Sequence, residues 1–312
     1  MPKQTDEKIV RETAPAKVNL FLHVVGKRPD GYHLLESLIA FATDGDVITV
    51  EPARKLSLKI DGDYAAPLNA EEDNLVLSAA KSLAEAVGRE PKVKLRLTKS
   101  LPVAAGVGGG SADAAATLRA LCRLWEVTPE PELLHGLATR LGADVPVCLE
   151  SQTAYVAGIG EEITPLPSLP SAPALLINPN LPVSTAAVFR ARTGPFSAPG
   201  ACDLRRLQQI SSGSDLARVV GTLRNDLDPP ARKTEPAIGD VLGAVRACAG
   251  VTLARMSGSG ATCFGLFDSI ESRDAAAETL KSNRPDWWVM ATHLGGAALT
   301  TRTSVASPRA NG

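Results

Sequence analysis

The sequence lacks the patterns expected of a metal-bound or disulfide-linked protein. Its five cysteines are widely spaced and odd in number, and none forms a Cys-x-x-Cys pair. The four histidines form no His-x-x-x-His pattern. These absences argue against a structural zinc site. Buried thiols in a reducing compartment fit the cysteine pattern better.

Long apolar runs are missing as well. No stretch approaches the ~20 apolar residues that a membrane-spanning helix needs. Residues 1–13 are charged and polar, without the apolar core of a signal peptide. We therefore expect a cytoplasmic protein without a membrane partner.

Neither sign of charge is in excess. Lys and Arg together number 33 against 34 for Asp and Glu, which leaves a net charge of −1. Proteins that bind nucleic acid usually carry a basic excess, so we expect no nucleic-acid partner. The chain of 312 residues is 44% hydrophobic and 21% charged, a composition typical of globular proteins with one large domain or two ordinary ones.

The first half of the chain reads as strands followed by helices. Apolar residues alternate with Lys17 and Asn19 along residues 16–24, which predicts a half-buried strand with both side chains on its polar face. The sequence Asp44-Gly45-Asp46 predicts a turn between two further strands. Expected strands span 16–24, 34–41, 47–51, 56–60 and 93–97, and expected helices span 75–87, 111–125 and 130–141. This order favours an α+β fold over a regular βαβ alternation.

A stretch rich in Gly, Pro and Ser at 158–173 predicts a domain boundary. Beyond it we expect strands at 174–177, 252–256, 263–267 and 287–292, and helices at 184–191, 216–224, 236–249 and 272–283. The last of these elements form half of a ferredoxin-like pattern. We expect domains at 1–165 and 166–302, followed by a flexible tail at 303–312.

A glycine-rich loop lies between an expected strand and an expected helix. Four of the five residues 106–110 are glycine, which lets successive backbone N–H groups surround an anion at the start of a helix. Ser111 follows; it could cap this helix or touch phosphate and Mg²⁺. The loop lacks the Gly-Lys-Ser/Thr of a Walker A motif and the Gly-x-Gly-x-x-Gly of a dinucleotide site. A simple chain reversal is the alternative, but so many glycines favour phosphate binding.

Three motifs in order along the chain resemble those of the GHMP kinases. They are Pro15-Ala16-Lys17-Val18-Asn19-Leu20, the stretch from Pro102 through the glycine loop to Ala115, and Ser257-Gly258-Ser259-Gly260-Ala261-Thr262. The resemblance implies an ATP-dependent kinase that uses Mg²⁺. It also implies an N-terminal domain like domain 2 of ribosomal protein S5, a ferredoxin-like C-terminal domain, and an active site in the cleft between them.

The resemblance also implies which residues bind ATP. They are Pro102, Val103, Ala104, Ala105, Gly106, Val107, Gly108, Gly109, Gly110, Ser111 and Ala112, with Asn74, Leu75 and Lys99. Lys99 could reach the phosphates, but it also follows a strand whose outer face is simply basic. Asp113 departs from the family pattern, because Ala112-Asp113 stands where many members carry Ser-Asn. Its carboxylate could favour the helix dipole while pointing away from the ligand.

A kinase acting on an alcohol needs a carboxylate to take the hydroxyl proton and a cation beside it. Asp144 lies in an otherwise apolar run, where it is either a cap for the next turn or a functional acid. Lys17 taken alone reads as a solvated lysine. The resemblance implies that Asp144 is the catalytic base and that Lys17 pairs with it and polarises the acceptor hydroxyl. No protein ligand for a metal ion is expected beyond Ser111.

Within the family, residues 28–33 and 142–146 and the triple glycine best match members whose small-molecule substrate carries a cytidine diphosphate. The implied substrate contacts are Asn19, Tyr32, His33, Asp144, Thr185 and Phe189. Tyr32 would stack on the cytosine and His33 would bond its edge, although the sequence alone favours a hairpin-end aromatic and a surface imidazole.

Other readings of the sequence remain. A mevalonate-type or homoserine kinase is the first alternative, and a non-catalytic nucleotide- or RNA-binding module is the second. The net charge and the presence of both Lys17 and Asp144 disfavour the second. We expect a monomer or a weak homodimer.

Overall fold

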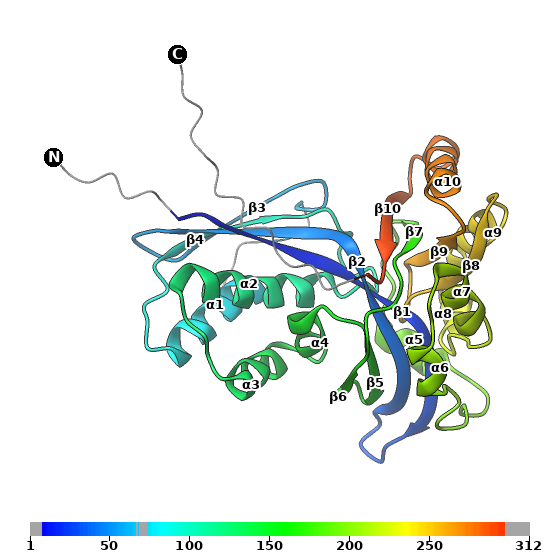
Figure 1. Ribbon diagram of the computed structural model, residues 1–312, viewed down its shortest axis with the longest axis horizontal. Coiled ribbons are helices and arrows are strands. Elements are labelled where there is room, and N and C mark those ends of the chain that lie inside the picture. The colour runs from blue at the N-terminus through cyan, green and yellow to red at the C-terminus, as the bar shows by residue number, and fades with distance from the viewer. Residues whose placement is uncertain (1–7, 67, 69–73, 297–312) are drawn as a thin grey trace.

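The computed structural model describes residues 8–66, 68 and 74–296 (Figure 1). The expected tail at 303–312 lies outside the described residues. Among the helices of the described part, none is both long and apolar enough to cross a membrane.

The N-terminal half is a mixed sheet with helices on one side. Two long antiparallel strands, β1 (Val10–Lys27) and β2 (His33–Pro52), form its centre. The remaining strands are β3 (Ser57–Asp61), β4 (Val93–Thr98), β5 (Ala154–Gly158) and β6 (Glu162–Pro165). Figure 1 shows α1 (Leu75–Ala86), α2 (Gly109–Trp125), α3 (Pro131–Leu141) and α4 (Val145–Glu150) together beneath this sheet.

The C-terminal half contains an antiparallel sheet in the order β10-β7-β9-β8. Its strands are β7 (Ala172–Asn178), β8 (Val251–Met256), β9 (Cys263–Phe267) and β10 (Trp288–Leu294). Its helices are α5 (Thr185–Ala191), α6 (Leu204–Gln208), α7 (Gly213–Gly221), α8 (Asp228–Thr234), α9 (Ala237–Arg246) and α10 (Ile270–Asn283). Helical crossovers follow the first and third of its strands, so the half is ferredoxin-like as expected.

Each face of the C-terminal sheet packs into a different core. Leu175 and Ile177 of β7 point toward α9 and α10. Leu176 between them and Phe264 of β9 pack instead with residues of β1 such as Val18. The two halves therefore share one hydrophobic core across β1. The expected domain boundary near 165 falls between β6 and β7 and stays a prediction.

The expectation of a half-buried first strand is wrong. Lys17 and Asn19 are both buried, as is Val18 between them. The cause is tertiary, because α2 packs on β1 and the C-terminal half encloses it from the other side. Alternation of polar and apolar residues indicates which side chains share one face of a strand. It does not indicate whether another part of the protein covers that face.

The turn expected at Asp44-Gly45-Asp46 is also wrong, because β2 runs through it as one strand. Gly45 pairs with Pro15 beside an irregularity in β1. A Cβ at position 45 would lie 2.7 Å from the Cα of Pro15, so glycine serves the close approach of two backbones here.

The other expected elements are confirmed within a few residues, including the Asn74 cap of α1, whose side chain accepts from the Val76 N–H at 2.9 Å. Helix α2 begins at Gly109, two residues before the expected start. Five short elements were not anticipated: α4, α6, α8, β5 and β6. Each has seven residues or fewer, too short for periodicity to distinguish it from a loop. All five cysteines are free.

Candidate active site

The glycine-rich loop enters α2 through a left-handed residue. Gly108 is the N-cap of the helix, with φ of 64°, and Gly106 also has a positive φ of 74°. Both conformations favour glycine. The first N–H groups of a 17-residue helix lie directly after the loop. Ser111 does not cap this helix, because it lies inside the first turn.

The loop rests on β1 and on the turn formed by residues 257–262. The Lys17 N–H donates to the Val107 carbonyl at 2.9 Å, and the Thr262 N–H donates to the Ala105 carbonyl at 3.2 Å. A Cβ at Gly106 would collide with the Gly260 carbonyl oxygen. The second and third family-like motifs therefore pack against each other, and the first lies beneath them.

Lys17 and Asp144 form an ion pair with 3.0 Å between Nζ and Oδ1. The Lys17 side chain is 7% exposed, whereas that of Asp144 is 46% exposed. Asp144 precedes α4 but makes no side-chain capping bond, so the capping alternative is wrong. The solvated-lysine reading of Lys17 is wrong too. The buried ammonium of Lys17 thus holds the solvent-accessible carboxylate of Asp144 beside the glycine loop.

Asn19, two residues after Lys17 in β1, bonds to the 257–260 turn. Its side chain donates to the Ser37 hydroxyl at 2.8 Å, and its backbone N–H donates to the Ser257 hydroxyl at 3.0 Å. The buried Asn225 holds the same turn by donating to the carbonyls of Met256 at 2.9 Å and Gly258 at 2.8 Å. Sequence reasoning missed Asn225, which no local pattern distinguishes.

A hollow of about 230 Å³ lies beside the loop. Its lining includes eight of the residues expected to bind ATP: Asn74, Leu75, Lys99, Pro102, Val103, Ala104, Gly109 and Gly110. Ala105, Gly106, Val107, Gly108, Ser111 and Ala112 are not among the residues that line it. The structure thus brings the start of α1, the end of β4 and both ends of the loop to one place.

Lys99 is not part of a basic outer face. Its ammonium is buried and forms ion pairs with Asp46 and with Asp113, the latter at 2.9 Å. Burial alone would lower the pKa of Lys99, but the two carboxylates outweigh it and raise the pKa. The Asp113 carboxylate is turned toward Lys99, and the expectation that it points away from the ligand stays a prediction. Sequence reasoning missed Asp46, although its place in an apolar strand could have marked it.

A larger hollow of about 940 Å³ brings together four of the expected substrate contacts. These are Tyr32, His33, Thr185 and Phe189. The rings of His33 and Phe189 are stacked, with centroids 4.9 Å apart and planes inclined by 22°. Tyr32 is 61% exposed at the tip of the β1–β2 hairpin. Thr185 shares a 2.8 Å hydrogen bond with Ser259, which joins this hollow to the turn beside Asn19.

Three cations line the same hollow, and sequence reasoning missed them: Lys27, Arg190 and Arg192. Burial lowers the pKa of His33, and the charges of Lys27 and Arg192 lower it further. The imidazole is therefore neutral at neutral pH and can either donate or accept a hydrogen bond. Cations with an aromatic stack suit an anionic ligand that carries a ring.

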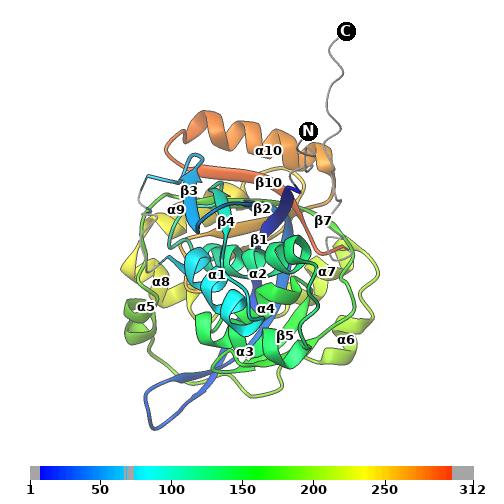
Figure 2. The same cartoon turned by 90° about the vertical axis from the view of Figure 1, so that its left-hand side faces the viewer.

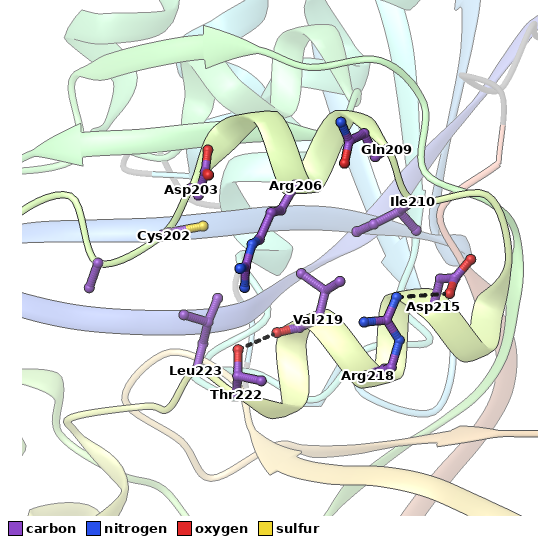
Figure 3. A pocket seen from close by; sticks show the side chains of 11 residues that line it. Cys202, Asp203, Arg206, Gln209, Ile210, Asp215, Arg218, Val219, Thr222 and Leu223 are labelled. Carbon is purple, nitrogen blue, oxygen red and sulfur yellow. Dashed lines mark hydrogen bonds and ion pairs between the residues drawn. The ribbon is translucent and has the colours of Figure 1, made fainter.

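A further hollow of about 390 Å³ lies between α6 and α7 (Figure 3). Figure 3 shows the Arg206 side chain extending across it toward Leu223. None of the expected site residues lines it. Expected nucleotide and cytosine contacts line the other two hollows, whereas Lys17, Asn19 and Asp144 are not among the residues that line either one.

Two family models match the chain. The GHMP kinases N terminal domain matches residues 74–152, and the GHMP kinases C terminal model matches residues 204–286. A 4-diphosphocytidyl-2-C-methyl-D-erythritol kinase of Paramagnetospirillum magneticum is 51% identical over 90% of this chain and 97% of its own. The chain belongs to the GHMP kinase family. A relative of the same name from Rhodospirillum rubrum is 50% identical over 92% of this chain and 93% of its own.

Solved structures agree with this family. A crystal structure of a 4-(cytidine 5'-diphospho)-2C-methyl-D-erythritol kinase covers 92% of this GHMP kinase and 99% of its own chain, with 35% identity and a TM-score of 0.75. A homoserine kinase from Cytophaga hutchinsonii covers 95% and 98%, with a TM-score of 0.71, but only 19% identity. The second likeness concerns the fold alone. The two-domain α+β architecture expected from the motifs is confirmed.

Proposed function

We propose that this GHMP kinase transfers the γ-phosphoryl group of ATP to the 2-hydroxyl of 4-diphosphocytidyl-2-C-methyl-D-erythritol. The products would be the 2-phosphate and ADP, in the non-mevalonate route to isoprenoid precursors. Relatives that bear this kinase name match nearly the whole chain at about half identity. The reaction needs no membrane or nucleic acid, and we propose that it takes place in the cytoplasm.

The observation that carries this proposal is the ion pair of Lys17 and Asp144. Asp144 is accessible, and its carboxylate lies 3.0 Å from the buried ammonium of Lys17. The pair lies beside a loop that is suited to binding phosphate. A carboxylate held in this way can accept the proton of a substrate hydroxyl as the hydroxyl oxygen bonds to the γ-phosphorus. The bond from that phosphorus to the bridging oxygen breaks, and ADP leaves.

Lys17 has two roles in this scheme. Its ammonium keeps Asp144 in position, and it stabilises negative charge on the attacking oxygen during transfer. Because Gly108 has no Cβ, the Lys17 side chain can lie close to the loop. A Cβ at position 108 would lie 3.2 Å from Cε of Lys17. Most of the rate enhancement would then come from positioning and electrostatics.

The hollow beside the loop supports nucleotide binding by Asn74, Leu75 and the loop glycines. Within the described residues, no three metal-ligating side chains gather at one place. Such a site suits Mg²⁺ that retains phosphate and water ligands, with the Ser111 hydroxyl as the side chain we propose to touch it. Bound there, Mg²⁺ would neutralise charge on the phosphates.

The larger hollow supports binding of the cytidine diphosphate. We propose that the stacked pair of His33 and Phe189 and the exposed Tyr32 hold the cytosine, and that Thr185 and Asn19 guide the erythritol toward Asp144. The lining cations would attract the diphosphate.

The test is ADP release with a panel of acceptors: the cytidylated erythritol, mevalonate, phosphomevalonate, galactose and homoserine. We expect turnover with the cytidylated erythritol alone. Turnover only with mevalonate-type alcohols would contradict the proposed substrate, while the assignment as a kinase would stand. ATP binding without turnover on any acceptor would favour the non-catalytic alternative.

A further inference from the structure

Residues 224–226, between α7 and α8, form a short stretch that is bonded to β1. The Leu22 N–H donates to the Arg224 carbonyl at 3.1 Å, and the Asp226 N–H donates to the Leu22 carbonyl at 2.8 Å. Asn225 is 5% exposed, and the side chain of Asp226 is 7% exposed. The stretch thus carries two neighbouring buried polar side chains. Their partners belong to two different parts of the active site.

Asn225 fastens the 257–260 turn. Its amide nitrogen donates to the carbonyls of Met256 at 2.9 Å and Gly258 at 2.8 Å, and its amide oxygen accepts from the Leu227 N–H at 2.9 Å. Both amide hydrogens are therefore in use, and the side chain is a connection between backbone segments rather than a contact for a ligand. Without this amide, two carbonyls in a buried place would lose a donor.

The turn in its place supports the glycine-rich loop. The Thr262 N–H donates to the Ala105 carbonyl at 3.2 Å. A Cβ at Gly106 would collide with the Gly260 carbonyl oxygen, so the backbones of the turn and the loop are in direct contact. A displacement of the turn would therefore displace the loop that is suited to binding phosphate.

Asp226 fastens a different loop, which lies beside the larger hollow. Its Oδ2 accepts from the Val24 N–H at 2.8 Å and from the Ser197 hydroxyl at 2.5 Å. The Ser197 N–H in turn donates to the Val24 carbonyl at 2.9 Å. Three residues just before Ser197 line the larger hollow: Thr193, Gly194 and Phe196. Asp226 therefore holds one wall of this hollow against β1.

The loop that Asp226 holds carries an aromatic ring and a cation. The ring of Phe196 is 48% exposed, and the guanidinium carbon of Arg192 lies 4.9 Å from its centroid. Arg192 also donates to the Pro195 carbonyl at 2.6 Å, within the same loop. An aromatic ring and a cation suit a ligand that has a ring and a negative charge. A displacement of this loop would therefore weaken binding of the acceptor.

We propose that Asn225 and Asp226 are positioning residues that act on separate parts of the reaction. Asn225 acts through the turn on phosphoryl transfer, and Asp226 acts through the loop at 193–197 on acceptor binding. Neither of them lines the hollows assigned to the two substrates. Because they are neighbours on one stretch fixed to β1, a single piece of backbone sets the glycine-rich loop and the acceptor hollow relative to each other. This inference rests on the proposed function.

The test is steady-state kinetics of Asn225→Ala and Asp226→Ala with ATP and the cytidylated erythritol. Transfer requires the γ-phosphorus and the acceptor oxygen in line, so a displaced loop should lower kcat of Asn225→Ala about tenfold, with the acceptor KM within about threefold. A displaced hollow wall weakens binding in the ground state and the transition state alike. Asp226→Ala should therefore raise the acceptor KM about tenfold and keep kcat within about twofold.

Three further variants separate positioning from a general loss of stability. Leu280→Ala truncates a buried side chain of α10 that lines neither hollow, and should be less stable with kcat and KM within about twofold of normal. Asn225→Ser keeps a hydroxyl that can donate to one of the two carbonyls, and should lose less kcat than Asn225→Ala. Ser197→Ala removes only the hydroxyl that Asp226 holds, and should raise the acceptor KM. The serine and alanine substitutions at 225 and 197 decide the matter if either larger truncation fails to fold.

The outcomes separate this inference from the proposed function. The same change of kcat and KM in the variants at 225 and 226, or kinetics as little altered as those of Leu280→Ala, would overturn the separate positioning roles while the proposed function stands. No turnover of the cytidylated erythritol by the unmodified protein would overturn the proposed function and this inference with it.

Discussion

Two buried lysines flank the glycine-rich loop, and their surroundings differ. Lys17 has one carboxylate partner, Asp144, which is 46% exposed. Lys99 has two partners, Asp46 and Asp113, and both are buried. Each ammonium is almost inaccessible to solvent, so the difference lies in the carboxylates rather than in the lysines.

The exposure of the partner separates a reactive pair from a structural one. A carboxylate that is half exposed can turn to an incoming hydroxyl while its lysine stays fixed. A carboxylate enclosed with its lysine contributes to the rigidity of the loop, and breaking such a pair leaves a buried charge without a partner. We therefore expect mainly a loss of activity at Lys17–Asp144 and mainly a loss of stability at Lys99.

The largest effect is expected for Asp144→Asn. Asparagine cannot accept the hydroxyl proton, so kcat should fall by about 10²–10⁴-fold, the usual contribution of general base catalysis. Lys17→Ala should cause a loss of similar size. Steady-state ADP release measures kcat, and thermal melting of both variants checks that the fold is intact. Near-normal turnover of purified Asp144→Asn would contradict its role as the base.

Much of this comparison could not be predicted from the sequence. Lys17 and Asp144 were paired through the family-like motifs, since the residues alone left Asp144 as either a cap or an acid. The elements that carry them were predictable, because their hydrophobic periodicity and glycine stops are local signals. Lys17 is covered by the glycine loop at Gly108 and by Asp144, both far along the chain from it, and no local signal contains that information.

The cluster around Lys99 was missed for the same reason. Asp46 lies 53 residues before Lys99 and Asp113 lies 14 after it, so their meeting depends on the pairing of β2 with β4 and the packing of α2. The basic residues that alternate along β4 suggested an exposed Lys99, but Lys99 is in phase with the buried positions of the strand and not with the basic ones. The alternation therefore places Lys99 on the buried side.

The second effect is a loss of stability in Lys99→Met. Removing the shared cation leaves buried carboxylate charge unpaired, which should lower the free energy of unfolding by about 3–5 kcal/mol. Chemical denaturation measures this change. The matched control is Lys94→Met on β4, the strand that Lys99 follows, where an exposed pair with Glu51 predicts a loss of at most about 1 kcal/mol. If Lys99→Met were as stable as its control but inactive, Lys99 would be a phosphate ligand and the contrast with Lys17 would fail.

The smallest effect tests whether the position of Lys17 matters beyond its charge. Gly108→Ala places a Cβ about 3.2 Å from Lys17 Cε, which must then move by a few tenths of an ångström, so kcat should fall roughly tenfold. The backbone strain of alanine at positive φ also costs about 1–2 kcal/mol.

Gly88→Ala is the control, because Gly88 has the same φ of 64° and no atom within 4 Å of its Cβ position. We expect the two variants to lose similar stability, measured by denaturation, and only Gly108→Ala to lose kcat. Equal kcat in both would mean that Lys17 tolerates displacement and contributes mainly its charge.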